Sequence, residues 1–377
     1  MRINSGGSHI FYVKWSMLSK IVNIGGFSHV RSVQIGGASP VVVQTMWKDS
    51  LSDTDLKDDS TVKKIQSLEN IGCGLLRFAV PDIKSAEILG SLAQKVSMPL
   101  VADIHFDYKI ALRCLDYPIA KLRINPGNIG GREKVRVVLE KAAAKNVPVR
   151  IGVNAGSLPQ DLSGLKTAQA LVQAAQRELS VFKEFGFNNV LVSMKASGIA
   201  DTIEANRLFS RRMDTPLHLG VTEAGPLADG IAANTAALCM LLKEGIGDTI
   251  RVSLSDSMEN EVIAGRAIIR AAAQLTAENE RLKLKGVKIV SCPRCGRHAF
   301  DTLGFTNRWL SRLYAMEKDI TVAIMGCEVN GPTEAKHASL GITGAGDKVL
   351  VFKQGKVIKT ICAAEADKIF EEELMNL

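Results

Sequence analysis

The stretch LVADIHFDYKIALRCLDYPIAKLRINPGNIGGREKVRVVLEKAAAKNVPVRIGV, residues 100–153, decides the fold. It contains three short runs rich in Val, Ile and Leu, at 100–106, 120–125 and 147–153. Between the last two runs, residues 132–145 repeat apolar side chains at helical spacing. Short strands that alternate with longer amphipathic helices are typical of a parallel sheet, in which each helix returns the chain to the start of the next strand.

The same unit repeats on both sides of this stretch. Helical patterns are found at 61–71, 83–96, 132–145, 167–185 and 227–244. Strands are expected at 41–46, 74–80, 100–106, 120–125, 147–153, 189–197, 216–222 and 248–255. Eight such units predict a (β/α)8 TIM barrel over residues 30–285. An open doubly wound sheet is the alternative, but it rarely uses eight units this regular.

The pattern changes after the helical segment at 259–284. A strand at 287–290, a helix at 300–316 and a strand at 320–325 are followed by a hairpin (349–352 and 357–361) and a last helix at 363–375. This predicts a small α/β domain at 286–377. Residues 1–29 are predicted to be a leader rather than a signal peptide, because no small-residue cleavage site follows, and Met17 is an alternative start.

Composition limits the kind of partner. The chain is 46% hydrophobic and 23% charged, which excludes a disordered protein. The net charge of +8 favours anionic partners, but aromatic residues are only 5%, which disfavours a nucleic-acid surface built on stacking rings. No apolar run approaches the roughly 18 residues of a membrane span, so the cytoplasm is expected. Seven cysteines in 377 residues are too few for a disulfide framework.

Cations gather where the predicted strands end. Active sites of TIM barrels lie at the carboxyl ends of the strands. Five strands each deliver one cation to that end: Arg77, Arg123, Arg150, Lys195 and Arg251. Burying them together is prohibitive without anions, and Asp103 and Glu223 answer only part of the charge. A small ligand with two phosphate groups would answer the rest through forked guanidinium contacts.

Lys195 has a second interpretation. A lysine near the end of the sixth barrel strand is also where a Schiff base forms in aldolases. The surrounding arginines favour a phosphate contact instead.

Three cysteines lie in Gly- and Pro-rich loops of the second domain. Cys292 and Cys295 form a C-x-x-C pair, and Cys327 follows in the string Met-Gly-Cys-Glu. A Cys3His zinc site completed by His298 or His337 is one interpretation. Three thiolates also fit an iron–sulfur cube whose fourth iron takes another ligand. Glu328 and Glu334 are the acidic candidates for that ligand, and the residues themselves do not choose between them.

Five ordered motifs resemble one family. They occupy residues 101–108 (VADIHFDY), 122–130 (LRINPGNIG), 150–158 (RIGVNAGSL), 217–225 (LHLGVTEAG) and 326–332 (GCEVNGP). Together they resemble the 4-hydroxy-3-methylbut-2-enyl diphosphate synthases, over residues 30–377 and in the two-domain bacterial form.

The resemblance implies an iron–sulfur oxidoreductase of the methylerythritol phosphate pathway. It implies reductive ring opening and dehydration of 2-C-methyl-D-erythritol 2,4-cyclodiphosphate, with a [4Fe–4S] cluster as cofactor and a flavodoxin or ferredoxin as electron donor. It also implies a homodimer. The implied cluster ligands are Cys292, Cys295, Cys327 and Glu334. The implied substrate contacts are Arg77, Arg123, Asn125, Arg150, Asn154, Ser157, Lys195, Arg251 and Ser253. Glu223 is expected to deliver a proton to the departing hydroxyl, and Glu334 to yield to substrate oxygen.

Two places depart from the family pattern. Residues 47–49 are Trp-Lys-Asp, where small polar residues are more usual, and Glu328 stands beside Cys327. Glu328 is expected to lower the cluster potential. Two alternatives of other kinds stay open: a non-catalytic, zinc-stapled barrel that binds a phosphate ligand or RNA, and a barrel transferase with a structural metal.

Overall fold

The computed structural model describes residues 18–276, 279–329 and 331–377. The chain divides into two compact units, one ending at Lys283 and the other beginning at Leu284. Residues 1–17 of the predicted leader, including the alternative start Met17, lie outside the described residues. No helix within the described ranges is long and apolar enough to cross a membrane.

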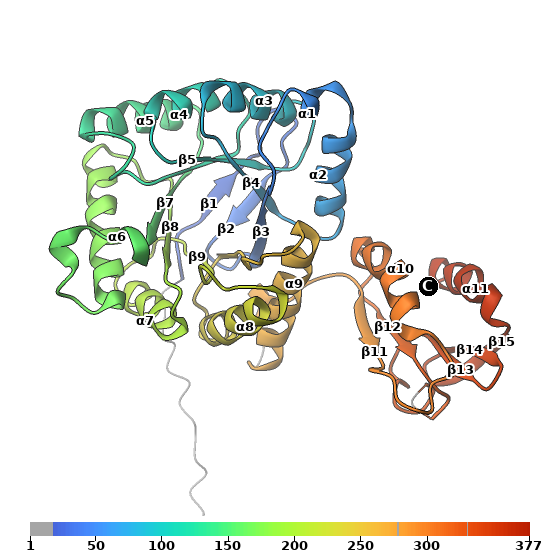
Figure 1. The fold of residues 1–377 in the computed structure, drawn as a ribbon. Helices are drawn as coiled ribbons and strands as arrows, with labels where there is room; N and C mark the ends of the chain where they lie inside the picture. The colour runs from blue at the N-terminus through green and yellow to red at the C-terminus, as the bar shows by residue number, and fades with distance from the viewer. Residues whose placement is uncertain (1–17, 277–278, 330) are drawn as a thin grey trace, which may run out of the picture. The chain divides into compact units, whose positions relative to one another are not determined.

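The first unit is a (β/α)8 barrel, which confirms the predicted fold (Figure 1). Its strands are β3 (Val42–Met46), β4 (Leu75–Ala79), β5 (Leu100–Ile104), β6 (Lys121–Ile124), β7 (Val149–Asn154), β8 (Val190–Lys195), β9 (His218–Leu219) and β10 (Thr249–Ile250). They pair in the order β8-β7-β6-β5-β4-β3-β10-β9, and every pair is parallel. A parallel bridge between Val192 and Leu217 joins the two ends of this order and closes the barrel.

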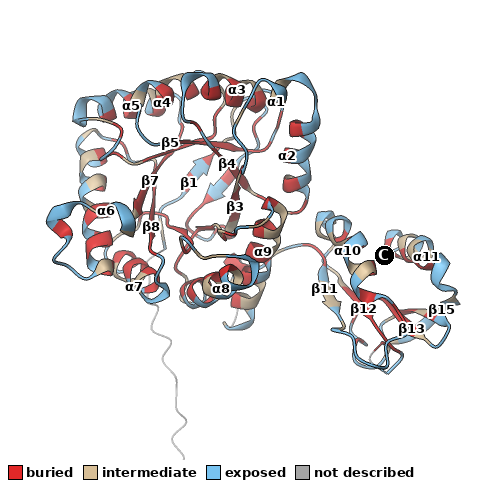
Figure 2. Ribbon diagram, in the orientation of Figure 1, coloured by how far each residue is buried: buried red, intermediate tan, exposed pale blue. Residues whose placement is uncertain are grey.

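Helices cover the outside of the barrel. They are α1 (Thr54–Lys57), α2 (Ser60–Asn70), α3 (Ile83–Ala93), α4 (Tyr108–Cys114), α5 (Arg132–Ala144), α6 (Thr167–Glu184), α7 (Ile199–Ser210), α8 (Leu227–Lys243) and α9 (Met258–Gln274). Figure 2 shows the strands buried along their length and the helices buried on the side that faces them. This division follows from the helical spacing of the apolar residues, which gives each helix one apolar stripe.

A hairpin closes the amino-terminal end of the barrel. Its strands β1 (Val22–Ile24) and β2 (Val33–Ile35) pair antiparallel. Their apolar side chains pack with Leu75, Val101 and Leu191 from the starts of barrel strands. The predicted boundary at residue 30 is therefore too late, because the alternating apolar residues of β1 belong to this plug.

The last two barrel strands are shorter than the predicted 216–222 and 248–255. Beyond them two backbone amides bond to side chains: Val221 N donates to Asn234 Oδ1 at 3.1 Å, and Leu254 N donates to Glu261 Oε1 at 3.0 Å. Side chains of α8 and α9 thus accept hydrogen bonds from backbone amides where the chain leaves the sheet.

The second unit is a five-stranded mixed sheet with two helices. The strands run in sequence order: β11 (Lys288–Ser291), β12 (Thr321–Met325), β13 (Leu340–Ala345), β14 (Lys348–Lys353) and β15 (Lys356–Ile361). The helices α10 (Thr302–Ala315) and α11 (Ala366–Met375) contribute Phe305, Trp309 and Phe370 to the core.

Strand β13 lies between the predicted strand at 320–325 and the predicted hairpin, where no element was expected. Its glycines are required by close packing rather than by a turn. A Cβ on Gly341 would lie 2.1 Å from the Phe352 ring, and a Cβ on Gly344 would lie 2.4 Å from the backbone of Ala299. Glycine inside a strand often marks such an approach, and it removes the β-rich signal that sequence reasoning uses.

Candidate active site

One cavity opens among the carboxyl ends of the barrel strands. Parallel register sets Asp103, Arg123 and Arg150 in line on β5, β6 and β7. The cavity has a volume of 210 Å³. Its lining residues are Met46, Arg77, Asp103, His105, Arg123, Arg150, Asn154, Ser193, Lys195, Thr222, Arg251 and Ser253. Seven of the nine predicted substrate contacts are thus gathered around one space, including all five cations.

Asp103 holds two of the arginines. Its carboxylate lies 2.9 Å from Arg123 Nη1 and 3.5 Å from Arg77 Nε. Burial by itself raises the pKa of Asp103, but Arg77, the hydrogen bond with His105 and Arg123 outweigh it and lower the pKa below its usual range. Asp103 is therefore ionised, and it orients guanidinium groups instead of moving protons.

Glu261 holds a third arginine, and sequence reasoning missed it. This α9 carboxylate is fully buried and lies 3.2 Å from Arg251 Nη2 and 2.7 Å from Lys48 Nζ. Its other oxygen accepts from Thr45 Oγ1 at 2.6 Å. The expected counter-charge was Glu223, but Glu261 is the carboxylate that pairs with Arg251. It was missed because it lies on a helix and not at a strand end.

The remaining cations have weaker partners than a carboxylate. Arg150 Nη1 donates to the neutral Ser193 Oγ at 2.9 Å. Burial first, then the nearby cations, lower the pKa of both Arg150 and Lys195 well below their ordinary values. The buried Nε atoms of Arg123 and Arg150 have no hydrogen-bond partner within the part of the chain that is described. Unpaired buried donors beside a cavity indicate an anionic ligand.

Two glycines make room for these side chains. A Cβ on Gly152 would lie 2.6 Å from Arg123 Nε, and a Cβ on Gly220 would lie 2.7 Å from Lys195 Nζ. Glycine at these strand positions lets a cation lie flat against the neighbouring backbone.

Three predicted residues do not line the cavity. Asn125 starts the turn after β6, where its carbonyl accepts from Asn128 N at 2.9 Å. Ser157 is exposed and donates to the Asn154 carbonyl at 3.3 Å. Glu223 is exposed beyond β9, with a left-handed backbone (φ 54°) that non-glycine residues seldom adopt. Such strain is concentrated at functional sites.

The three loop cysteines lie at one edge of the second sheet. Cys292 follows β11 and Cys327 follows β12, and these neighbouring strands are parallel, with Ser291 opposite Ile324. The backbone between them is tied by Ala299 N, which donates to the Gly326 carbonyl at 2.7 Å. Cys292 Sγ would lie 3.7 Å from a Cβ on Gly326, so its thiol faces the loop that carries Cys327.

The donor chemistry of this edge suits a thiolate-bound metal group. All seven cysteines lie in the described residues, and none forms a disulfide. Cys295 is exposed, and Cys292 is partly so. Within residues 18–276, 279–329 and 331–377, however, no three Cys, His, Asp or Glu side chains are yet placed to hold a metal ion. Cys292 and Cys327 nevertheless follow neighbouring parallel strands at the same end of the sheet.

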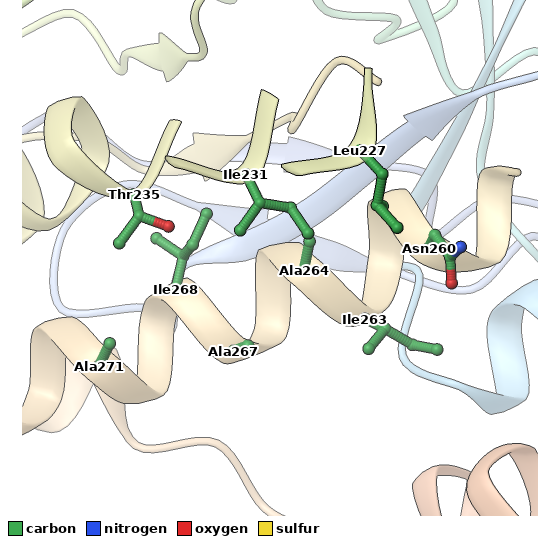
Figure 3. A pocket seen from close by; sticks show the side chains of 9 residues that line it. All are labelled: Leu227, Ile231, Thr235, Asn260, Ile263, Ala264, Ala267, Ile268 and Ala271. Atoms are coloured by element: carbon green, nitrogen blue, oxygen red, sulfur yellow. The ribbon is translucent and has the colours of Figure 1, made fainter. Parts of the chain in front are cut away.

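A different hollow lies outside the barrel between α8 and α9 (Figure 3). It measures 360 Å³, and its walls are mainly apolar, with Leu227, Ile231, Ile263 and Ile268 among them. Its nine lining residues, all within the described ranges, include no charged side chain. The five cations thus line the cavity at the strand ends and not this hollow.

Fold and site together define a TIM-barrel protein followed by a small cysteine-bearing α/β unit. The barrel has a cationic mouth, the name used below for the cavity at the carboxyl ends of its strands. The chain belongs to the GcpE family. Residues 27–266 match the family's TIM-barrel domain, and residues 288–376 match the GcpE protein C-terminal domain.

Curated relatives resemble the chain over nearly its whole length. A protein of Treponema pallidum is 50% identical over 94% of this chain and 91% of its own length. A protein of Treponema denticola is 47% identical (96% and 99%), and one of Thermodesulfovibrio yellowstonii is 43% identical (92% and 97%). Each is named 4-hydroxy-3-methylbut-2-en-1-yl diphosphate synthase (flavodoxin).

Proposed function

We propose that the chain is an iron–sulfur oxidoreductase of isoprenoid precursor synthesis. It converts 2-C-methyl-D-erythritol 2,4-cyclodiphosphate into 4-hydroxy-3-methylbut-2-enyl diphosphate. The observation that carries the proposal is the cavity lined by five cations, with which only two carboxylates of the described residues, Asp103 and Glu261, pair. A compact ligand with two phosphate groups supplies the missing negative charge.

The barrel residues have binding roles in this reaction. Arg123, Arg150 and Lys195 would hold the phosphate oxygens, since the Nε atoms of both arginines have no hydrogen-bond partner among the described residues and Lys195 is buried among cations. Arg77 and Arg251 would complete the cradle, each held by a carboxylate at its back. Asn154 and Ser253 line the same cavity and would orient the hydroxyl-bearing carbons. Binding in a fixed orientation is itself a large part of the rate enhancement.

Cys292, Cys295 and Cys327, with Glu334, would hold a [4Fe–4S] cluster. That cluster, when bound, supplies the two electrons that the reduction consumes. A carboxylate is a more exchangeable ligand than a thiolate, so Glu334 is the ligand that would give way to a substrate oxygen. The flavodoxin in the relatives' names supports a flavodoxin as electron donor.

Glu223 would deliver the proton with which the substrate hydroxyl leaves as water. Its support is its place next to Thr222, which lines the cationic cavity, and its left-handed backbone. The homodimer implied by the sequence resemblance stays a prediction.

A non-catalytic, zinc-stapled barrel is not favoured, because relatives that match the chain almost end to end are named as synthases. The test is chemical analysis of protein purified without oxygen, followed by an assay of the cyclodiphosphate with reduced flavodoxin. We expect a brown protein with about four irons and four sulfides per chain. A colourless protein that carries one zinc after anaerobic reconstitution would refute the proposal.

A further inference from the structure

Beneath the cationic cavity the barrel contains a lysine that has no carboxylate beside it. Lys121 is the first residue of β6 and is fully buried. Its Nζ donates to Gln44 Oε1 at 3.1 Å. No carboxylate in the described chain forms an ion pair with it, and an isolated ammonium group is costly to bury.

Other buried groups around Lys121 add positive charge or none. Both carboxylates of the site are already paired: Asp103 with Arg123 and Arg77, and Glu261 with Arg251 and Lys48. Lys121 is hydrogen-bonded to Gln44 of β3, and it interacts by charge with Arg150 of β7, Arg77 of β4 and His218 of β9. Burial first, and then Arg150 and Arg77, hold the pKa of Lys121 well below its ordinary value.

Its hydrogen-bond environment suits an uncharged amine. Gln44 Nε2 is buried and has no partner within the described residues. A neutral amine offers a lone pair as well as N–H donors, so it can accept from the Gln44 amide once that amide turns over. An ammonium group has donors only.

A ligand in the cavity changes the charge balance above Lys121. Arg77 and Arg150 line the cavity, and they are also the cations that act most strongly on Lys121. Two phosphate groups bound to these arginines would neutralise the repulsion that disfavours an ammonium group below them.

We propose that Lys121 is a positioning residue of the substrate site: it is uncharged while the cavity is empty, and it takes up a proton when a diphosphate binds above it. It thereby becomes a sixth cation of the site. The inference rests on the proposed function, because the cyclodiphosphate is the ligand concerned. No atom of Lys121 lines the cavity, so it acts through Arg77 and Arg150.

The cyclodiphosphate is a suitable probe because it does not itself titrate near neutral pH. Each phosphate of the ring carries one ester bond and one anhydride bond. It therefore lacks the second acidic proton that a phosphate monoester loses near pH 6. Protons taken up on binding therefore come to the protein.

The test is titration calorimetry of the full-length, anaerobically purified holoprotein with the cyclodiphosphate and without a reductant. Measurement at about pH 8 in buffers of different ionisation enthalpy counts the protons taken up. The variants are Lys121→Met, which keeps the volume of the side chain, and Lys141→Met as a matched control. Lys141 lies on α5 and pairs with Asp116 at 2.6 Å, outside the barrel interior.

We expect the wild type and Lys141→Met to take up about one proton per chain more than Lys121→Met. If Lys121→Met takes up as many protons as the wild type, or if the wild type takes up none, the inference is overturned. In either case the heat of cyclodiphosphate binding still supports the proposed function. Absence of binding heat refutes both. If Lys121→Met does not fold, the wild type decides alone: its affinity must weaken as pH rises, and a pH-independent affinity overturns the inference.

Discussion

The barrel mouth and the cysteine edge of the second unit are built in opposite ways. Arg77, Arg123 and Arg150 are held in place by buried strands, and Asp103 pairs with Arg77 and Arg123, before any ligand is present. Cys292 and Cys295 lie in partly exposed loops whose thiolates are not yet gathered within the described chain. The fold alone forms the mouth, whereas the metal group would complete the cysteine edge, since metal binding often supplies the folding energy of its own site.

The largest effect is expected at the cysteine edge. Cys327→Ser should lose the bound iron and all turnover, because a hydroxyl is a poor substitute for thiolate. Binding of the cyclodiphosphate to the barrel should persist. Iron analysis and calorimetry on one sample measure both.

Cys362→Ser is the matched control, because Cys362 is exposed in the same unit and follows β15, away from the cysteine loops. It should keep its iron. If Cys327→Ser retained the iron content of the wild type, the assignment of this edge as the cluster site would be wrong.

A change at the barrel mouth should have the opposite outcome: weaker ligand binding with unchanged iron content. Arg150→Met should weaken binding of the cyclodiphosphate about a hundredfold, or about 2.7 kcal/mol, because a forked charge-assisted contact is lost. Iron content should not change. The ligand-free variant should also unfold at a higher temperature, since Met removes a buried cation that forms no ion pair with a carboxylate of the described residues.

Arg113→Met, outside the barrel on α4 where Arg113 pairs with Glu87, is the control for this change. It should bind the ligand as the wild type does. Unchanged affinity in Arg150→Met would remove the phosphate role from the centre of the mouth.

A smaller effect is expected from the carboxylate behind the mouth. Glu261→Gln should raise KM about tenfold and change kcat less, because Arg251 and Lys48 lose an ionised acceptor but keep an amide oxygen. Glu259→Gln is the control, since Glu259 is on the same helix but pairs with Lys64 near the surface. Equal KM values in the two variants would show that Glu261 only supports the fold.

The mouth was more predictable from sequence than its supports. Neighbouring parallel strands that carry Arg77, Arg123 and Arg150 must bring these residues together inside a barrel, so the cavity follows from topology. Glu261 and Lys121 gave no such signal. Glu261 reads as one more acidic residue in the first turn of α9, and Lys121 as an ordinary surface lysine at a strand start.

The second unit shows where sequence patterns lose the fold. Strand β13 was missed because Gly341 and Gly344 suit both a loop and a tightly packed strand. The hairpin of β14 and β15 was found because Gly355 separates two β-rich runs. In the structure Gln354 and Gly355 have the positive φ angles that the turn requires. Close packing between distant segments is a tertiary property, and a local pattern cannot report it.

The smallest expected effect is a pH dependence that belongs to the mouth alone. The folded protein lowers the pKa of Asp103, so this carboxylate stabilises the fold above its unfolded-state pKa of about 3.9, and the contribution is lost as pH falls through the lower folded value. Asp103→Asn should therefore unfold at lower urea than the wild type at pH 7, and the difference should narrow on acidification below about pH 4. Cluster-free protein should be used, so that metal loss at the cysteine edge does not enter the comparison. A difference that stayed constant over this range would mean that the ion pairs of Asp103 with Arg77 and Arg123 do not stabilise the mouth.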